Sequence, residues 1–237
     1  MKPFLSSLIA VSVTACAPAE SPGVPDHAGA DSTLVVASSS RVPSDGRPSV
    51  VFLGTSLTAG LGLEQEEDTY VARLVEMADS AGKPFRAVNA GVSGETSAGG
   101  LRRLDWVLRE PLDVLVIELG ANDGLRGQDP FALSENLTQI IRRTRTRYPT
   151  VRIVLAAMEA PTNLGSMYTA IFREVFVSVA ETERTDLIPF LLDGVAGIPE
   201  LNQDDRIHPT AEGHSMVASN VWVVLERVLD DLAGGSP

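Results

Sequence analysis

Three polar side chains, widely separated in the sequence, are of the types that nucleophilic hydrolysis requires. Ser56 follows an apolar run that begins at Val50 and ends at a glycine, which is typical of a buried parallel strand meeting its loop. Asp205 and His208 stand three residues apart, and Pro209 disfavours a helical conformation at His208. The chain can therefore turn so that the carboxylate meets one ring nitrogen while the other nitrogen faces Ser56. That geometry gives a hydroxyl nucleophile an oriented base.

Three hydrogen-bond donors could stabilise the negative charge that develops on a reacting carbonyl oxygen. Asn122 follows the end of a predicted strand, so its side-chain amide can point across the edge of the sheet. The backbone N–H groups of Gly94 and Ser56 could supply two more donors. Gly94 lacks a Cβ, which lets a reacting oxygen approach closely. Loss of one such donor typically costs about 100- to 1,000-fold in rate.

Each of these signals also has an alternative explanation. A serine that opens a helix is commonly an N-cap, an isolated Asp-x-x-His pair is commonly a turn, and a loop asparagine such as Asn122 often holds its own turn. A metal site formed by Asp205, His208 and His214 is a further alternative, although this spacing is poor for ligation. The joint occurrence of the signals, each at a strand end or before a helix, favours a catalytic site.

Strand and helix patterns alternate along the chain. Short apolar runs predict strands over 50–54, 85–90, 113–119, 151–157 and 186–190. Apolar residues at 3.6-residue spacing predict helices over 68–81, 97–109, 130–147, 165–183 and 211–232. The alternation predicts an α/β domain with a five-stranded parallel sheet, helices on both faces and right-handed crossovers. The loops that carry the polar residues then gather at the carboxyl edge of the sheet, and Trp106 is expected in the core.

The first 48 residues have the pattern of an exported protein. Residues 1–15 combine Lys2, a short apolar run and small residues, which is typical of a signal peptide. The segment that ends at Cys16 resembles the bacterial lipoprotein box, which predicts lipidation of Cys16 and a membrane tether; the alternative is an ordinary signal peptide cut near Cys16. Residues 16–48 predict a flexible tether, and residues 49–237 the folded domain. We therefore expect a lipoprotein facing the periplasm or cell surface, or otherwise a periplasmic or secreted protein.

Charge and cysteine content narrow the possible functions. The net charge of −12 makes nucleic-acid binding an improbable main role. Four arginines between Arg142 and Arg147 are expected to form the solvated last turn of a helix, where cations suit the helix dipole, rather than a lipid-binding patch. Cys16 is the only cysteine, so the domain has neither a disulfide nor a cysteine nucleophile.

The segments that carry these residues resemble the four sequence blocks of the SGNH, or GDSL, hydrolases. The matching blocks are Gly54-Thr55-Ser56-Leu57, Gly94, Gly120-Ala121-Asn122-Asp123 and Asp205-x-x-His208-Pro209. The resemblance covers residues 49–232 and is closest to the bacterial arylesterase group, which includes the multifunctional acyl-CoA thioesterase and lysophospholipase. Thr55 stands where the family usually has Asp, which bears on the rigidity of the loop around Ser56.

This resemblance implies a fold and a mechanism. The implied fold is the three-layer α/β/α, flavodoxin-like fold. Ser56 is implied as the nucleophile, His208 as the base and Asp205 as the group that orients it. Ser56 N–H, Gly94 N–H and the Asn122 side chain are implied as the oxyanion donors. The resemblance implies no metal and no cofactor, and a small-molecule ester as substrate; nothing in the sequence specifies an oligomeric state.

Apolar residues near the strand ends are candidates for the acyl pocket: Leu57, Leu125, Met158, Pro161, Leu164 and Ile207. Each could equally belong to the core. The segment 124–129, with two glycines, is expected to move over the substrate. The leading hypothesis is a serine esterase for aryl and short-to-medium acyl esters, with thioesters and lysophospholipids as further substrates. Polysaccharide deacetylation ranks lower because aromatic residues make up only 5% of the chain. A non-catalytic surface lipoprotein is the third alternative.

Overall fold

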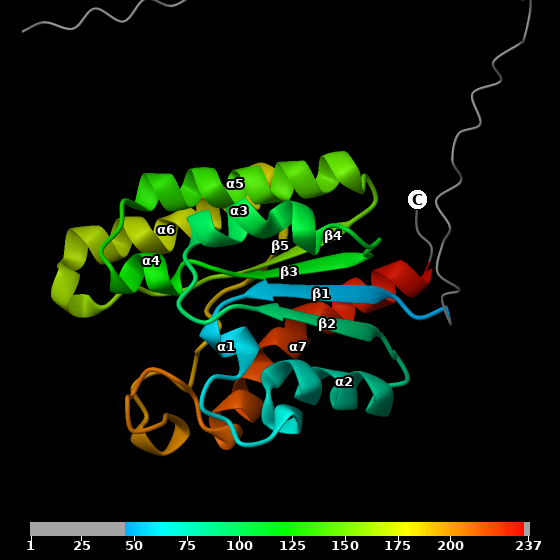
Figure 1. Cartoon of the computed structure of the whole chain (residues 1–237), viewed down its shortest axis with the longest axis horizontal. Helices are drawn as coiled ribbons and strands as arrows, with labels where there is room; N and C mark the ends of the chain where they lie inside the picture. The colour runs from blue at the N-terminus through cyan, green and yellow to red at the C-terminus, as the bar shows by residue number, and fades with distance from the viewer. Residues whose placement is uncertain (1–45, 235–237) are drawn as a thin grey trace, which may run out of the picture. The chain divides into compact units, whose positions relative to one another are not determined.

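The computed structural model describes residues 46–234, and these form a sheet covered by helices on both faces (Figure 1). The strands are β1 (Ser49–Gly54), β2 (Arg86–Gly91), β3 (Val114–Glu118), β4 (Arg152–Ala156) and β5 (Asp186–Ile188). All four pairings are parallel, in the order β2-β1-β3-β4-β5. The predicted five-stranded parallel sheet is confirmed. The predicted signal peptide, Cys16 and nearly all of the predicted tether lie outside the described residues.

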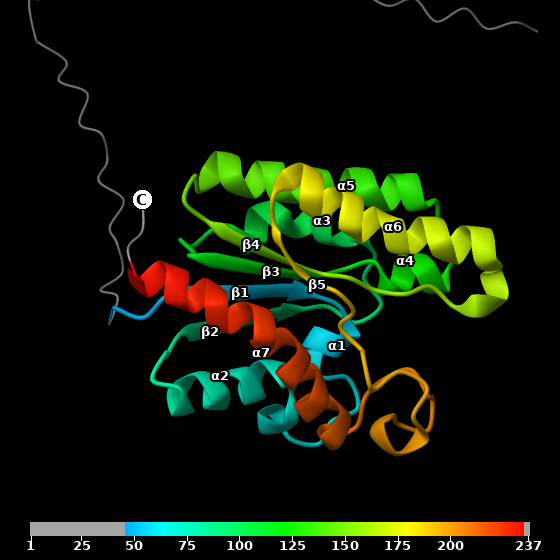
Figure 2. The same ribbon diagram turned by 180° about the vertical axis from the view of Figure 1, so that it is seen from behind.

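Helices connect the strands and complete the three layers. They are α1 (Ser56–Ala59), α2 (Tyr70–Ser80), α3 (Ser97–Val107), α4 (Ala121–Leu125), α5 (Pro130–Arg147), α6 (Ser166–Glu183) and α7 (Ala211–Gly234), with 3-10 turns η1 (Glu66–Asp68), η2 (Thr162–Leu164) and η3 (Pro199–Leu201). Figures 1 and 2 show α3, α5 and α6 on one face of the sheet and α2 and α7 on the other. Among residues 46–234, no helix has the length and apolar character needed to cross a bilayer.

The strand order brings the ends of three strands together. From β1 the chain passes through α2 to β2 on one side, and from β2 it passes through α3 to β3 on the other side. The crossovers therefore diverge next to β1, and open α/β sheets place their ligands at such switch points. In the registers, Gly54 at the end of β1 lies beside Gly91 of β2 and Glu118 of β3. The loops after β1, β2 and β3 thus leave the sheet at the same level.

Helix starts are set by local caps. Thr69 Oγ1 accepts a hydrogen bond from Ala72 N, which explains why α2 begins later than the predicted residue 68. Thr210 Oγ1 accepts a hydrogen bond from Gly213 N. This cap fixes where α7 begins, directly after the loop that carries His208.

The prediction that Trp106 lies in the core is wrong, because its side chain is 58% exposed. The inward face of α3 is made instead by small residues together with Leu104 and Val107. A Cβ on Gly100 would lie 2.5 Å from the side chain of Leu119, so α3 packs closely against the end of β3. Glycine lets the helix approach the sheet, and Trp106, two residues after the buried Leu104 and so about 200° around the helix, faces outward.

The arginines at the end of α5 lie in its last turns, as predicted, and they also tie α5 to its neighbours. Arg142 forms an ion pair at 2.8 Å with Glu183 at the end of α6. Arg143 pairs with Asp105 of α3 at 2.6 Å. These contacts hold the layer of α3, α5 and α6 together at the end of the sheet opposite the carboxyl edge.

His214 of α7 is a buried histidine that packs against α2. Its Nδ1 accepts a 3.1 Å hydrogen bond from the backbone N–H of Tyr70, and the two rings stack with their centroids 6.2 Å apart. Burial lowers the pKa of His214 to about 4, because the charged ring would lose its hydration; Asp68 opposes this effect and His208 adds to it.

We expect the free energy of unfolding to fall as the pH is lowered from 7 to about 4. In this window the unfolded chain binds a proton at His214 and the folded protein does not, so the stability rises with pH. A shift from 6.5 to about 4 corresponds to roughly 3 kcal/mol. Urea unfolding at several pH values, on the wild type and His214→Gln, measures the difference. An equal pH dependence in both proteins would contradict the assignment.

Candidate active site

The structure brings Ser56, His208 and Asp205 together at the carboxyl edge of the sheet. His208 Nε2 lies 2.8 Å from Ser56 Oγ, and His208 Nδ1 lies 2.6 Å from Asp205 Oδ2. With the carboxylate accepting from Nδ1–H, Nε2 is left to accept the hydroxyl proton. The Asp205 side chain is 46% exposed and that of His208 only 16%. The hydroxyl, the ring and the carboxylate therefore form one continuous hydrogen-bonded chain.

The loop between η3 and α7 holds the histidine and the aspartate as a local unit. Asp205 Oδ1 accepts hydrogen bonds from the backbone N–H groups of Ile207 and His208, at 2.9 and 3.0 Å, while Oδ2 holds the ring. The hydrogen bond from His208, followed by those of the two N–H groups, lowers the pKa of Asp205 to about 2. The backbone turns back on itself at Arg206, whose φ is +58°. Asp205 is therefore an ionised acceptor at neutral pH.

Ser56 is the first residue of α1 and does not act as its N-cap. Thr55 occupies the N-cap position, and its side chain makes no capping bond to the helix. The Ser56 hydroxyl is directed instead to His208. Within residues 46–234, no acceptor contacts the Ser56 N–H. This N–H group is thus available to a ligand.

The other two expected donors follow β2 and β3, the neighbours of β1. Gly94 has a φ of +77°, a conformation that favours glycine, and its carbonyl accepts a 2.8 Å hydrogen bond from Arg126 Nη2. Asn122 lies half-buried in α4, and its side-chain amide bonds to no other described residue. The amide of Asn122 therefore does not hold its own turn.

Sequence reasoning missed the carboxylates that fix the loops around these donors. Asp123 accepts hydrogen bonds from the N–H and hydroxyl of Ser97, at 2.8 and 2.6 Å, and so joins α4 to the start of α3. Glu118 of β3 bonds to Thr55 and Thr58 on either side of Ser56. In the sequence, Glu118 is an acidic residue that closes an otherwise apolar strand, and its position alone does not reveal these contacts.

The six candidate residues for the acyl pocket divide into two groups. Leu57 and Met158 are buried in the core, at 4% and 3% exposure. Leu125, Leu164 and Ile207 are exposed. Pro161 is half-buried. The exposed or half-buried residues can therefore contact a substrate without rearrangement of the core, whereas the two buried residues cannot.

The segment 124–129 is tied to α6 at one point. The hydroxyl of Tyr168 donates a 2.6 Å hydrogen bond to the carbonyl of Gln128. Gly127 has a φ of +59°, and a Cβ at this position would lie 3.7 Å from Leu164. Leu164 therefore packs beside the backbone of this segment.

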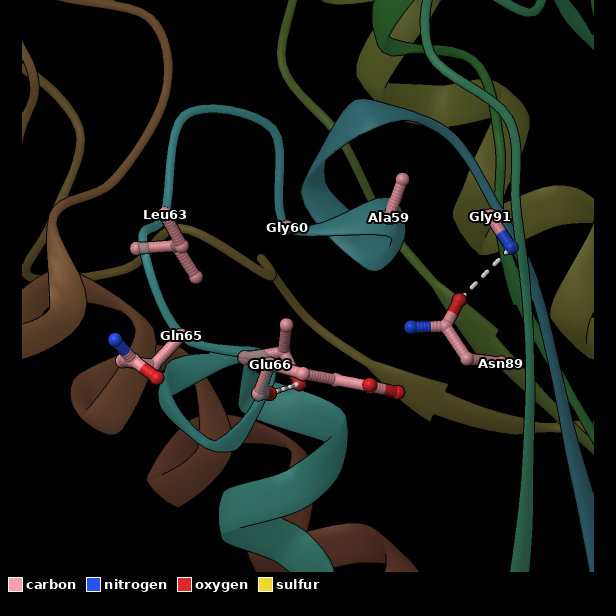
Figure 3. Close-up of a pocket in the computed structure, with 8 residues that line it drawn as sticks. Ala59, Gly60, Leu63, Gln65, Glu66, Asn89 and Gly91 are labelled. Atoms are coloured by element: carbon pink, nitrogen blue, oxygen red, sulfur yellow. Dashed lines mark hydrogen bonds between the residues drawn. The ribbon is translucent and has the colours of Figure 1, made fainter.

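A pocket of about 410 Å³ lies beside the end of α1 (Figure 3). Its walls come from the end of α1, the loop that follows, η1, the N-cap of α2 and β2, and they are Ala59, Gly60, Leu63, Gln65, Glu66, Thr69, Asn89 and Gly91. Asn89 Oδ1 accepts a 3.0 Å hydrogen bond from Gly91 N, and its amide nitrogen donates to the carbonyl of Thr58. None of the predicted acyl-pocket residues lines it.

The metal-site alternative has no support from the geometry. His214 already uses Nδ1 to accept the Tyr70 N–H, and His208 is engaged by Asp205 and Ser56. In the described part of the chain, no group of three potential ligands comes close enough to hold an ion.

A parallel sheet in the order 2-1-3-4-5, with a Ser-His-Asp chain of hydrogen bonds at its carboxyl edge, defines the class of serine hydrolases with a flavodoxin-like fold. The chain belongs to the GDSL-like lipase/acylhydrolase family, whose family model matches residues 52–216. The resemblance seen in the sequence blocks is therefore confirmed.

Known relatives of the chain carry esterase and thioesterase names. The chain is 39% identical to esterase TesA of Pseudomonas aeruginosa, over 76% of the chain and 89% of that protein. It is 33% identical to thioesterase 1/protease 1/lysophospholipase L1 of Escherichia coli, over 71% and 79% respectively. Among solved structures, the psychrotrophic esterase EstA of Pseudoalteromonas, inhibited by monoethylphosphonate, superposes with a TM-score of 0.72 and 31% identity, covering 77% of the chain and 99% of the EstA chain.

We expect Asp205→Asn to lower kcat by more than about tenfold and less than the roughly 10,000-fold seen for a buried triad aspartate. An amide cannot stabilise the charged ring as a carboxylate does, but water reaches this 46% exposed side chain and partly replaces it. Steady-state kinetics with a nitrophenyl ester measure the effect. Asp204→Asn, one residue earlier in the same loop, is the control, and an equal loss in both variants would contradict the role.

Proposed function

We propose that the protein is a serine esterase in which Ser56 is the nucleophile, His208 the general base and Asp205 the residue that orients the ring. The 2.8 Å contact between His208 Nε2 and Ser56 Oγ carries the proposal, because base and nucleophile are already within proton-transfer distance. The family membership and the esterase names of the relatives support it.

In the proposed reaction, Ser56 Oγ attacks the carbonyl carbon of the ester while His208 Nε2 takes the hydroxyl proton. The carbonyl oxygen becomes negatively charged and accepts hydrogen bonds from Ser56 N–H, Gly94 N–H and the Asn122 amide. When the tetrahedral intermediate collapses, the alcohol or thiol leaves with the proton from His208. Water then attacks the acyl-enzyme, with His208 again as base, and releases the carboxylic acid and the free serine.

The substrate class we propose is carboxylic esters with aryl or short-to-medium acyl groups, and in addition thioesters and lysophospholipids. The names of the Escherichia coli relative favour the thioester and lysophospholipid additions. Leu125, Leu164 and Ile207, with Pro161, offer exposed apolar contacts for the acyl chain. In this proposal Leu57 and Met158 do not line the acyl pocket; as core residues they set the shape of the loops. Movement of segment 124–129 over the substrate is part of the proposal.

We also propose that the enzyme is exported. The pattern of residues 1–15 supports a signal peptide, and the sequence around Cys16 supports a lipid anchor, with residues 16–48 as the tether. This arrangement would hold the domain of residues 49–237 close to a membrane that supplies acyl esters.

We expect Ser56→Ala to lose at least about 1,000-fold in kcat/KM toward nitrophenyl esters, because no other nucleophile replaces the hydroxyl. The assay uses esters of increasing chain length beside acetylated xylan. Ser219→Ala, a serine on α7 that bonds only to the carbonyl of Ser215, is the matched control. Equal rates for Ser56→Ala and the wild type would end the enzymatic proposal, and faster release of acetate from xylan would favour the polysaccharide alternative.

We expect Leu125→Ala to lower kcat/KM for medium-chain esters by up to about tenfold and to leave acetate esters unchanged, because the lost methyl groups contact only a longer acyl chain. Val223→Ala on α7, which also truncates an exposed apolar side chain, controls for a general effect. Met158→Ala should instead lower the stability by about 2–5 kcal/mol as a core truncation. An unchanged chain-length preference in Leu125→Ala would remove this residue from the acyl pocket.

A further inference from the structure

A buried carboxylate lies directly behind the nucleophile. Glu118, the last residue of β3, is 1% exposed. Its Oε2 accepts hydrogen bonds from the Thr55 N–H at 2.7 Å, the Thr58 N–H at 3.3 Å and the Thr58 hydroxyl at 2.8 Å. The Thr55 hydroxyl lies 2.9 Å from Oε1 and 3.1 Å from Oε2. The carboxyl group is therefore hydrogen-bonded to the chain on both sides of Ser56.

These contacts take the place of the missing helix cap. The first N–H groups of any α-helix lack partners within the helix, and a side chain at the N-cap normally satisfies one of them. The Thr55 side chain does not do so in α1. Glu118 accepts the third N–H of the helix, that of Thr58, from a neighbouring strand. Ser56 N–H remains without an acceptor in the described residues, and so stays free for a substrate oxygen.

A glycine and a second hydroxyl group complete the environment of the Glu118 carboxyl group. A Cβ on Gly54 would overlap the Thr58 hydroxyl and lie 2.6 Å from Glu118 Oε2, so the contact requires glycine at the end of β1. The Thr58 hydroxyl also meets the Tyr70 hydroxyl at 2.7 Å. Since Thr58 donates to Glu118, Tyr70 must donate to Thr58. A buried chain of hydrogen bonds thus leads from α2 through Thr58 to the carboxylate.

We propose that Glu118 is a positioning residue for catalysis, which holds the Thr55–Thr58 turn so that the Ser56 hydroxyl meets His208 and the Ser56 N–H faces the developing oxyanion. This inference rests on the proposed role of Ser56 as nucleophile. It also gives Thr55 a role, because the Thr55 hydroxyl donates a hydrogen bond to Glu118.

The hydrogen bonds to Glu118 require an acceptor oxygen at the Oε2 position, and they do not require a negative charge on the carboxyl group. Oε2 takes both N–H groups and the Thr58 hydroxyl, whereas Oε1 meets only the Thr55 hydroxyl, which can accept as well as donate. An amide with its oxygen at Oε2 would keep the contacts of that atom, and its nitrogen at Oε1 would donate to the Thr55 hydroxyl instead of accepting from it, with its second N–H left without one of these partners. Burial also raises the pKa of Glu118, which favours the uncharged carboxyl. Glutamine should therefore substitute for Glu118, and leucine should not.

The test compares Glu118→Leu and Glu118→Gln with the wild type, using a nitrophenyl ester and counting the reactive serine with a fluorophosphonate probe. We expect Glu118→Leu to lose about 100-fold in kcat per labelled serine, with KM little changed, because oxyanion stabilisation acts on the transition state. Glu118→Gln should stay within about tenfold of the wild type. A merely structural role would lower the number of labelled serines and leave kcat per labelled site unchanged.

Matched controls keep the outcomes separate. Glu183→Leu removes another buried carboxylate, which pairs with Arg142 at the opposite end of the sheet, and it should keep the wild-type kcat per labelled serine. If Glu118→Leu does not fold, Thr58→Val removes the hydroxyl that bonds to both Glu118 and Tyr70 and should lower kcat a few-fold at unchanged KM. Wild-type kcat per site in Glu118→Leu or in Thr58→Val, or an equal loss in the leucine and glutamine variants, would overturn the inference. Failure of the probe to label wild-type Ser56 would instead overturn the proposed function.

Discussion

The contact between His208 and Ser56 joins two residues that are 152 positions apart in the chain, and the rest of the architecture serves it. Closing so long a loop costs only a slowly growing entropy, but holding a hydroxyl within 2.8 Å of a ring nitrogen requires both ends to be rigid. The parallel sheet supplies that rigidity for Ser56, since β1 is buried along its whole length between β2 and β3. The cap of α7 and the turn around Asp205 supply it for His208.

Close approach of backbones is the second condition, and glycine meets it. A side chain on Gly54 would displace Glu118 and Thr58, and one on Gly91 would run into the backbone of Ala59. Gly94, with positive φ, then turns the chain after β2 so that its carbonyl reaches Arg126. These glycines therefore let the loops lie close to the strand ends, where polar groups from distant parts of the sequence meet.

Much of this arrangement could be predicted from the sequence because its signals are local. Apolar runs and 3.6-residue periodicity predicted the five strands and the main helices, and the Asp205-x-x-His208 spacing predicted the turn that brings the carboxylate to the ring. Features that depend on packing were not predictable. Trp106 follows an apolar pattern, yet Leu104 and the small residues of α3 face the sheet and the indole faces solvent. Hydrophobicity alone did not separate core residues such as Met158 from rim residues such as Leu125. Glu118 carries no periodic signal, and its partners lie 60 and 63 residues away.

The turn between Asn202 and Pro209 has a consequence for how such enzymes can change. An antiparallel bridge joins these two residues, and the loop's internal hydrogen bonds, from Gln203 N to His208 O and from Arg206 N to Gln203 O, close it on itself. The base and its carboxylate are therefore held by one short loop that is closed by its own hydrogen bonds. The stretch between β5 and this loop is itself anchored, because Asn202 Nδ2 donates to the carbonyls of Val195 and Ile198 and the side chains of Leu191 and Val195 are buried. A change of length in segment 189–198 would therefore shift Asn202 and, through its bridge to Pro209, the position of His208.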